Sequence, residues 1–114
     1  FFQSIPYDSL DPAGFRAPLG LLARNRGDCD AKSVGFAAAI RALHPGLGVR
    51  MILLSDHALI ALDTPPRPGE RAVRIDGRDW VLAEPVGPAL TRIGEIGAQS
   101  DRGLRGQTRA LALF

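Results

Sequence analysis

The amino-acid sequence predicts a single α+β domain in which one long helix precedes an antiparallel sheet. The chain has 114 residues, which is the usual size of one domain. Its only strongly helical stretch, 29–43, is followed between residues 49 and 84 by short apolar runs that turn residues separate. A helix that precedes strands with short connections is typical of the α+β class.

Composition excludes several other classes of protein. Apolar residues make up 46% and charged residues 23% of the chain, so it is neither disordered nor a coiled coil. A single cysteine cannot form an internal disulfide or a cysteine-rich zinc site. No apolar run approaches the roughly 18 residues of a membrane helix. Because the first residue is not methionine, we expect a segment of a longer protein, whose compartment, membrane contact and oligomeric state stay open.

The charge pattern argues against nucleic acid as a partner. The formal net charge is only +2, and the isoelectric point of 9.3 reflects arginines, since Lys32 is the only lysine. A nucleic-acid binder carries a basic stripe, usually with aromatic residues for stacking. Here the arginines alternate with acidic residues and aromatics are 6% of the chain. We therefore expect a mixed, solvated surface.

The helix follows a lead-in, 1–28, that is rich in turn-forming residues and allows only a short helical turn at 19–23. Asp28 is a good N-cap for a helix over 29–43, because its carboxylate can accept the free N–H groups of the first turn. Proline and glycine in the segment 44–46 end it. Apolar residues at three- and four-residue spacing predict one buried face: Val34, Phe36, Ala37, Ile40 and Leu43.

The next part of the chain, 49–84, predicts antiparallel strands. The apolar runs are 49–54, 57–62, 71–75 and 79–84. Three prolines make 65–69 a loop, and Asp76-Gly77 signals a hairpin between the last two strands. Over 85–114 the pattern is weaker: 90–96 reads as a short helix or a loop, and 109–114 as a last strand.

The lone cysteine, Cys29, lies in the first helical turn. Free backbone N–H groups and the helix dipole favour an anion there, and hence a thiolate, whereas the neighbouring Asp28 and Asp30 oppose it. A small buried cysteine is the alternative. Nucleophilic catalysis would also need a base within hydrogen-bond reach of the thiol.

Two histidines and two acidic residues are candidates to complete such a site. His44 lies at the helix C-terminus and has a structural role there, whereas His57 begins a strand and becomes a base if it faces the thiol. An acid would then orient the imidazole. Alternation in the fourth strand places Glu84 on the face of the bulky Trp80, which we expect to cover the helix, while Asp79 points away. A surface glutamate before a proline is the alternative for Glu84.

These residues stand in segments whose order characterises a known family. The first segment, at a helix start, is Gly27-Asp28-Cys29-Asp30-Ala31-Lys32. The second is His57, which opens a strand, and the third is Trp80-Val81-Leu82-Ala83-Glu84-Pro85. They resemble the transglutaminase-like cysteine-enzyme superfamily, above all its small bacterial transglutaminase-like cysteine proteases. The opening Phe2-Gln3-Ser4-Ile5-Pro6-Tyr7 resembles the segment that precedes the cysteine helix in such proteins.

The resemblance implies a papain-like core, with a cysteine on a helix packed against an antiparallel sheet that supplies histidine and an acid. It makes Cys29 the nucleophile, His57 the general base and acid, and Glu84 the orienting carboxylate, where the superfamily commonly has aspartate. The backbone N–H of Cys29 and the side-chain amide of Gln3 are the oxyanion donors that it suggests. The aromatic residue that follows the histidine in many relatives is absent, because the chain continues Ala58-Leu59-Ile60.

The sequence thus favours a thiol hydrolase of peptide or isopeptide amide bonds that acts through a thioester, with transamidation as a variant of the same chemistry. Its partner would be a peptide or protein substrate, and no cofactor is expected. Some bacterial relatives depend on calcium, but Asp28 and Asp30 are too few ligands for a calcium site, so no metal is expected. The alternatives are a non-catalytic binding or scaffolding module of a larger envelope protein and a plain α+β domain with a buried cysteine.

Overall fold

The computed structural model describes residues 1–9, 17–106 and 108–113 and confirms the α+β class. Its elements are η1 (Phe2–Ser4), α1 (Pro18–Arg24), α2 (Cys29–Leu43), β1 (Val49–Leu53), β2 (Ala58–Leu62), β3 (Ala72–Ile75), β4 (Arg78–Ala83), α3 (Ala98–Gly103) and β5 (Arg109–Ala112). Part of the predicted lead-in, 10–16, and the last residue of the predicted strand 109–114 lie outside the described residues. No helix of the described ranges is long and apolar enough to cross a membrane.

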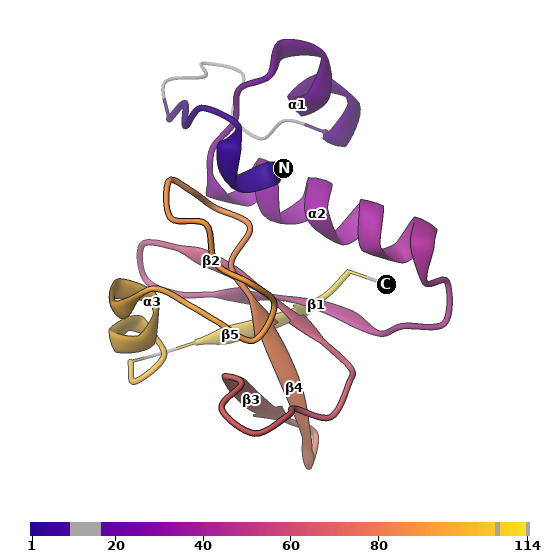
Figure 1. The fold of residues 1–114 in the computed structure, drawn as a ribbon, viewed down its shortest axis with the longest axis vertical. Coiled ribbons are helices and arrows are strands. Elements are labelled where there is room, and N and C mark those ends of the chain that lie inside the picture. The colour runs from indigo at the N-terminus through magenta and orange to yellow at the C-terminus, as the bar shows by residue number, and fades with distance from the viewer. Residues whose placement is uncertain (10–16, 107, 114) are drawn as a thin grey trace.

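The strands form a curled antiparallel sheet in the order β3-β4-β2-β1-β5 (Figure 1). Consecutive strands β1 and β2 pair as a hairpin, with Met51 opposite Ile60. Strand β4 pairs with β2 on one side and with β3 on the other, and β5 returns from the far end of the chain to pair with β1. The turn before β2 and the end of β4 therefore lie next to each other, because β2 and β4 are antiparallel neighbours.

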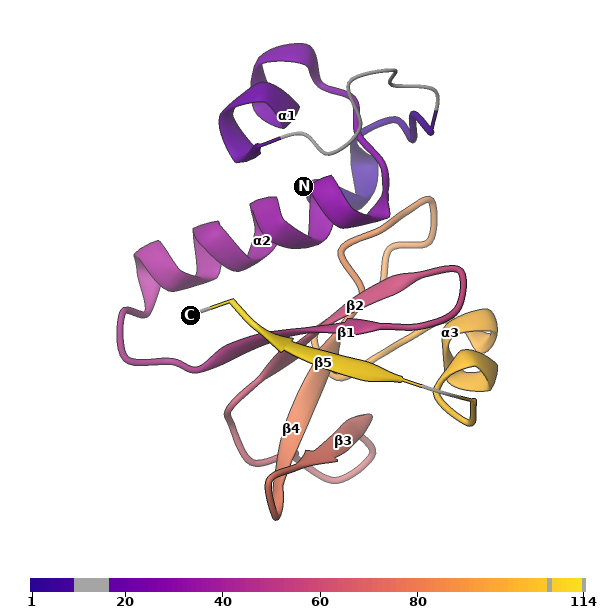
Figure 2. The ribbon, with the colours of Figure 1, turned by 180° about the vertical axis from the view of Figure 1, so that it is seen from behind.

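Helix α2 lies across one face of the sheet, and α1 lies on the outer side of α2 (Figures 1 and 2). Alternate residues of the central strands, among them Met51 and Ile60, pack against α2 in one hydrophobic cluster. The opposite face is also covered, because Leu59 and Leu82 pack in a second cluster with Ile96 and Leu104, which flank α3. The sheet is thus the middle layer of the domain.

The expectation that the face of Trp80 covers the helix is wrong. Ala83 packs in the cluster under α2, whereas Trp80 and Leu82 belong to the cluster on the other face. The prediction assumed that bulky residues mark the helix side, but both faces are buried here, so size does not identify the side. The Trp80 ring also lies under the guanidinium groups of Arg50, at 5.0 Å, and Arg78, at 5.7 Å.

Helix α2 begins and ends where the sequence predicts. The Asp28 carboxylate accepts a 2.8 Å hydrogen bond from the backbone N–H of Ala31, as an N-cap does. At the other end the N–H of His44, the C-cap residue, donates to the carbonyl of Ile40 at 2.8 Å. These contacts fix Cys29 as the first helical residue.

The C-terminal third differs most from the prediction. Residues 90–96 are a loop, one of the two expected alternatives, and helix α3 was not predicted. Its N-cap, Gly97, provides no side-chain hydrogen bond, so the usual signal of a helix start is missing. Hydrogen bonds to distant residues hold α3 instead, including one from Gln99 Nε2 to Asp56 Oδ2 at 3.2 Å.

The N-terminal elements are held on α2 by a small cluster around Leu21. This side chain is fully buried and packs with Ile5 and Ala31, with Phe2 at the margin. Gly35 of α2 makes the close approach possible, because a Cβ there would lie 2.8 Å from Leu21 Cδ2. Leu21 thus joins α1 to the helix that carries Cys29.

We expect Leu21→Ala to lower the free energy of unfolding by about 2–4 kcal/mol, because it removes a fully buried side chain and leaves a cavity. Leu19→Ala, on the same helix, is the matched control: Leu19 is 81% exposed and should lose less than about 0.5 kcal/mol. Urea unfolding followed by circular dichroism measures both. Equal losses in the two variants would contradict the proposed packing of α1.

Candidate active site

Cys29 lies at the N-terminus of α2 and is partly buried. The first intrahelical hydrogen bond runs from the N–H of Lys32 to the carbonyl of Asp28, and the Asp28 carboxylate caps Ala31. The N–H groups of Cys29 and Asp30 lie outside this pattern, as expected in a first helical turn. The Cys29 thiol donates a 3.5 Å hydrogen bond to Asp30 Oδ1. It therefore stands at the positive end of the helix dipole, beside a carboxylate that accepts its proton.

His57 enters the site from the turn between β1 and β2. The turn is closed by a hydrogen bond from the N–H of Leu54 to the carbonyl of His57, at 2.8 Å. The imidazole is 17% exposed, and its Nε2 lies 2.8 Å from Glu84 Oε1. Since Nε2 faces the carboxylate, Nδ1 is the ring nitrogen that is left for Cys29.

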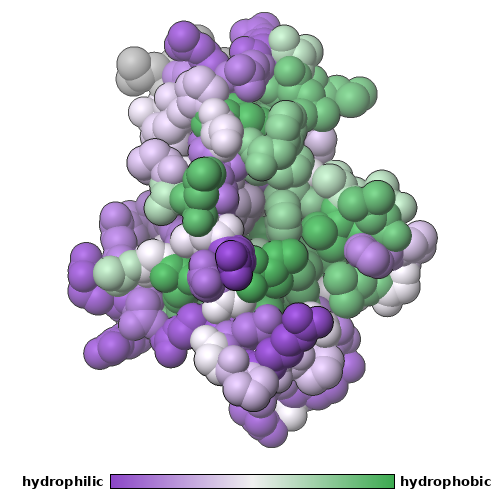
Figure 3. Space-filling model, in the orientation of Figure 1, coloured by the Kyte–Doolittle hydropathy of each residue, from purple (hydrophilic) through white to green (hydrophobic). Residues whose placement is uncertain are grey.

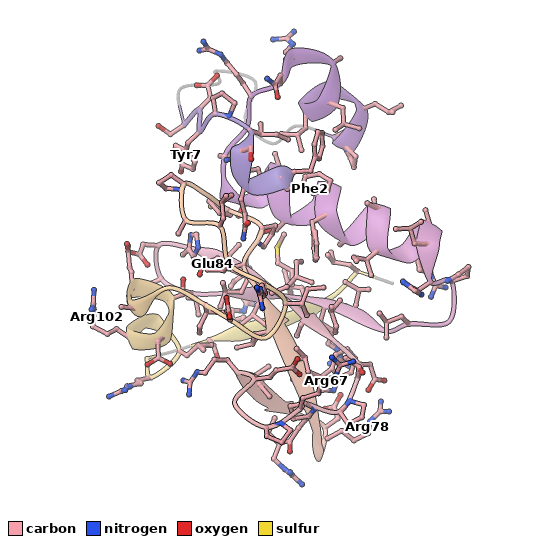
Figure 4. All side chains as sticks on the ribbon, in the orientation of Figure 1. Phe2, Tyr7, Arg67, Arg78, Glu84 and Arg102 are labelled. Atoms are coloured by element: carbon pink, nitrogen blue, oxygen red, sulfur yellow. The ribbon has the colours of Figure 1, made fainter. Side chains whose placement is uncertain are left out.

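Glu84 directly follows β4, and its carboxylate is only 11% exposed (Figure 4). Besides facing His57, Oε1 accepts a hydrogen bond from Ser100 Oγ at 2.6 Å, and Oε2 accepts one from the N–H of Gly97 at 2.6 Å. Burial raises the pKa of Glu84, but these hydrogen bonds and the His57 charge outweigh it and leave the pKa below its usual range. The carboxylate is therefore held in its ionised form.

The His57 imidazole is coupled to both other groups. Interaction with the Cys29 side chain is the largest cause that raises the pKa of His57 to about 9, and the hydrogen bond with Glu84 is the second. Burial opposes both effects, because it disfavours the charged ring. The raised pKa favours the charged, imidazolium form of the ring. The structure thus brings Cys29, His57 and Glu84 together, as the sequence suggested.

Ser100 and Gly97 are site residues that the sequence analysis missed. Both belong to the unpredicted start of α3, and Ser100 is 1% exposed. A serine and a glycine in a weakly patterned segment give no sequence signal of this role. Only the fold shows that the start of α3 donates hydrogen bonds to the Glu84 carboxylate.

Gln3 lies beside the site but is engaged with the main chain. Its Nε2 donates to the carbonyl of Glu84 at 2.7 Å, and to the carbonyl and hydroxyl oxygens of Thr91 at 3.0 and 2.7 Å. In this arrangement the Gln3 amide ties the N-terminal segment to the end of β4. The oxyanion role suggested for Gln3 would require its amide to leave these acceptors.

The segment after Glu84 is shaped by the same N-terminal residues. Gly87 approaches Gln3 so closely that a Cβ at this position would overlap the Gln3 carbonyl oxygen. Glycine is therefore needed at position 87 for the loop to lie against η1. This contact and the hydrogen bonds of the Gln3 amide together hold the loop that follows Glu84 against the N-terminal segment.

Two pockets adjoin Glu84, and one of them also adjoins His57. One, of about 220 Å³, is lined by His57 and Glu84 together with residues 86–89 and 97–100. The other, of about 330 Å³, lies between η1, α2 and the loop after β4, and its lining includes Phe2, Phe36 and Ile93. Apolar surface is visible over α1 and α2, whereas the β3–β4 end is hydrophilic (Figure 3).

The other candidate residues, His44 and Asp79, lie away from Cys29, His57 and Glu84, and the metal site considered at Asp28 and Asp30 has too few ligands. His44 caps the opposite end of α2, and the exposed Asp79 forms an ion pair with Arg74 at 3.2 Å. Among the described residues, no group of three or more His, Cys, Asp or Glu side chains is placed to hold a metal ion. The Asp28 carboxylate is instead engaged as the N-cap.

Comparisons with protein-family models, with curated proteins and with solved structures found no match for this chain.

An NMR titration of the histidine ring signals tests the coupling between His57 and Cys29. We expect His57 to titrate at about pH 9 in the wild-type protein. In Cys29→Ala its midpoint should move down toward 6.5, because the largest cause of the raised pKa is lost, while Glu84 keeps it from falling fully. The signals of His44 serve as the internal control. A His57 midpoint that Cys29→Ala leaves unchanged would contradict the contact.

Proposed function

We propose that this domain is a thiol hydrolase that cleaves peptide or isopeptide amide bonds through a thioester on Cys29. The observation that carries the proposal is the position of His57 between two partners. One ring nitrogen lies 2.8 Å from the Glu84 carboxylate, and interaction with the Cys29 side chain is the largest cause of the raised pKa of the ring. Nucleophile, base and orienting acid are the components that such catalysis needs.

The architecture supports the finer proposal of a papain-like or transglutaminase-like core. The nucleophile comes from the first turn of α2, whereas His57 and Glu84 come from adjacent ends of β2 and β4. This division between a helix and an antiparallel sheet is the one that the resemblance in the sequence implies.

In the proposed acylation step, the Cys29 thiolate attacks the carbonyl carbon of the scissile amide and forms the S–C bond of a tetrahedral intermediate. The His57 imidazolium donates its Nδ1 proton to the amide nitrogen, the C–N bond breaks, and the amine leaves. The N–H of Cys29, which lies outside the intrahelical pattern, is a donor for the oxyanion. Glu84 holds the ring and stabilises its charged form.

In the deacylation step, the now neutral His57 accepts a proton from water, and the hydroxide oxygen attacks the thioester carbonyl. The C–S bond breaks, the carboxylic acid leaves, and the thiolate–imidazolium pair is restored. If an amine enters instead of water, the same steps form a new amide. The ratio of hydrolysis to transamidation therefore depends on which nucleophile reaches the thioester.

The pH dependence of alkylation by iodoacetamide tests the nucleophile without a known substrate. Cys29 is the only cysteine, so the label reports this thiol alone. We expect a reactivity midpoint well below pH 8 in the wild-type protein and a higher midpoint in His57→Ala, which lacks the imidazolium. Cys29→Ala should take no label and should abolish cleavage of dye-labelled casein while its circular dichroism spectrum stays native.

A wild-type midpoint at or above about 8.5 that His57→Ala does not move would overturn the proposal. The cysteine would then be structural, and a binding or scaffolding module would be the better description. Loss of the native fold in Cys29→Ala would also count against the assignment, because this change removes little packing.

The role of the acid predicts a graded series at pH 7. His57→Ala should slow alkylation by roughly 10- to 30-fold, because most of the thiol becomes protonated. Glu84→Gln should slow it less, by roughly threefold, since the amide oxygen can still accept from His57 while the charge is lost. Glu95→Gln is the matched control, because Glu95 is an exposed glutamate in the neighbouring loop. A Glu84→Gln variant with the wild-type rate would assign the orienting role to another group.

A further inference from the structure

The apolar pocket of about 330 Å³ adjoins Glu84, and the proposed chemistry does not use it. It lies between η1, the second half of α2 and the loop after β4, and its lining includes Phe2 and Phe36. These two rings meet edge to face, with their centres 5.9 Å apart. Ligand pockets are mostly apolar and measure about 300–1,000 Å³, so this one has room for part of a ligand.

Large apolar side chains at this pocket are exposed to water. Phe1, Leu43 and Ile93 all line it, and all three are exposed. Each forgoes the free energy that burial of such a side chain provides. Single exposed apolar residues are common on protein surfaces, but a group of them around one hollow is typical of a binding site.

The charges of the lining favour a neutral ligand over a basic one. Among the described residues that line the pocket, only Glu84 and Arg92 have charged side chains. The Glu84 carboxylate is already engaged with His57 and with the start of α3. Arg92 is exposed, so a basic side chain that entered the pocket would meet a like charge. An apolar side chain meets no such penalty.

The pocket and the nucleophile lie along the same face of α2. Cys29, Phe36 and Ile40 stand at positions i, i+7 and i+11, which fall on one side of a helix. All three pack against the hydrophobic cluster between α2 and the sheet, and the last two also line the pocket. Phe36 lies about 10 Å beyond Cys29 along the helix axis. An extended peptide covers this distance with about three residues.

We infer that this pocket binds a large apolar side chain of the substrate, about three residues from the scissile bond. The inference rests on the proposed function, because it names a substrate class for the same site. A dry cavity of about 150 Å³ holds a benzene ring, so 330 Å³ accepts the side chain of phenylalanine or leucine together with adjoining backbone. Binding buries apolar surface of the substrate and of the exposed side chains at the pocket.

Reactive peptides that alkylate Cys29 test this inference without a known cleavage site. One pair is iodoacetyl-Gly-Gly-Phe amide and its Gly-Gly-Ala counterpart, and the other is the chloromethyl ketone of acetyl-Phe-Gly-Gly and its Ala-Gly-Gly counterpart. The thiolate displaces the halide and forms a thioether in every case. The two pairs place phenylalanine on opposite sides of the reactive carbon, at the third residue.

We expect the phenylalanine peptide of one pair to label Cys29 at least about tenfold faster than its alanine counterpart, because only its ring is buried in the pocket. A lysine peptide of the same length should react no faster than the alanine peptide. All rate constants are divided by that of iodoacetamide, which reports the reactivity of the thiol alone.

Two alanines of α2 provide a matched pair of variants. Ala39 lines the pocket, so Ala39→Phe places a ring in it and should reduce the preference for phenylalanine to roughly onefold, with the iodoacetamide rate unchanged. Ala42 is exposed and is not among the described residues of the lining, so Ala42→Phe should keep the preference. Circular dichroism checks the fold of both, and the wild-type comparison decides the matter if Ala39→Phe does not fold.

The outcomes separate this inference from the proposed function. Equal labelling within both peptide pairs, with an iodoacetamide midpoint well below pH 8, would overturn the role of the pocket and preserve the nucleophile. A midpoint near 8.5 that His57→Ala does not move would overturn the proposed function and the inference with it. A preference that persists in Ala39→Phe would place the apolar subsite elsewhere. A wild-type dimer in sedimentation equilibrium that Ala39→Phe dissociates would assign the pocket to a second copy of the chain and overturn the inference.

Discussion

The site depends on the burial of the Glu84 carboxylate where β4 ends. This acid accepts hydrogen bonds from three residues in two parts of the chain: His57 before β2, and Gly97 and Ser100 at the start of α3. Burial alone would raise the pKa of Glu84, and the hydrogen-bond donors together with the His57 charge outweigh that effect. The buried acid therefore stays ionised because the turn before β2 and the start of α3 both place donors against it.

The same carboxylate explains why the C-terminal third folds as it does. Helix α3 has a glycine N-cap without a side-chain hydrogen bond, and isolated helices of this length are unstable in water. Its first turn gains stability from Glu84, and further support comes from the Gln99–Asp56 hydrogen bond and from ion pairs of Asp101 with Arg71 and Arg105. Glu84 and α3 thus stabilise each other, because the start of α3 donates hydrogen bonds to the carboxylate and the carboxylate accepts the free donors of the helix start.

Sequence patterns predicted the parts of the fold that local rules decide. Asp28 as the N-cap and the proline and glycine after His44 were sufficient to bound α2. Alternation gave the strands but not their orientation, because both faces of the sheet are buried and Trp80 turned out to face away from α2. The start of helix α3 and the role of Ser100 depend on contacts between residues 13 apart or more, which no short pattern records. The grouping of Cys29, His57 and Glu84 was accessible because the family resemblance, rather than periodicity, linked them.

The charges around the first turn of α2 require a positive charge near Cys29 if its thiolate is to form. A thiolate is favoured there by the helix dipole but disfavoured by Asp28 and Asp30, of which Asp28 is needed as the helix cap. The residue that fixes the position of Cys29 therefore also opposes its ionisation. The opposition has to be met by positive charge from another element, and the fold offers it from the sheet side, where His57 lies. A nucleophile at a carboxylate-capped helix start depends on a nearby cation for this reason, and the Glu84 carboxylate serves it indirectly by holding the His57 ring and favouring its charged form.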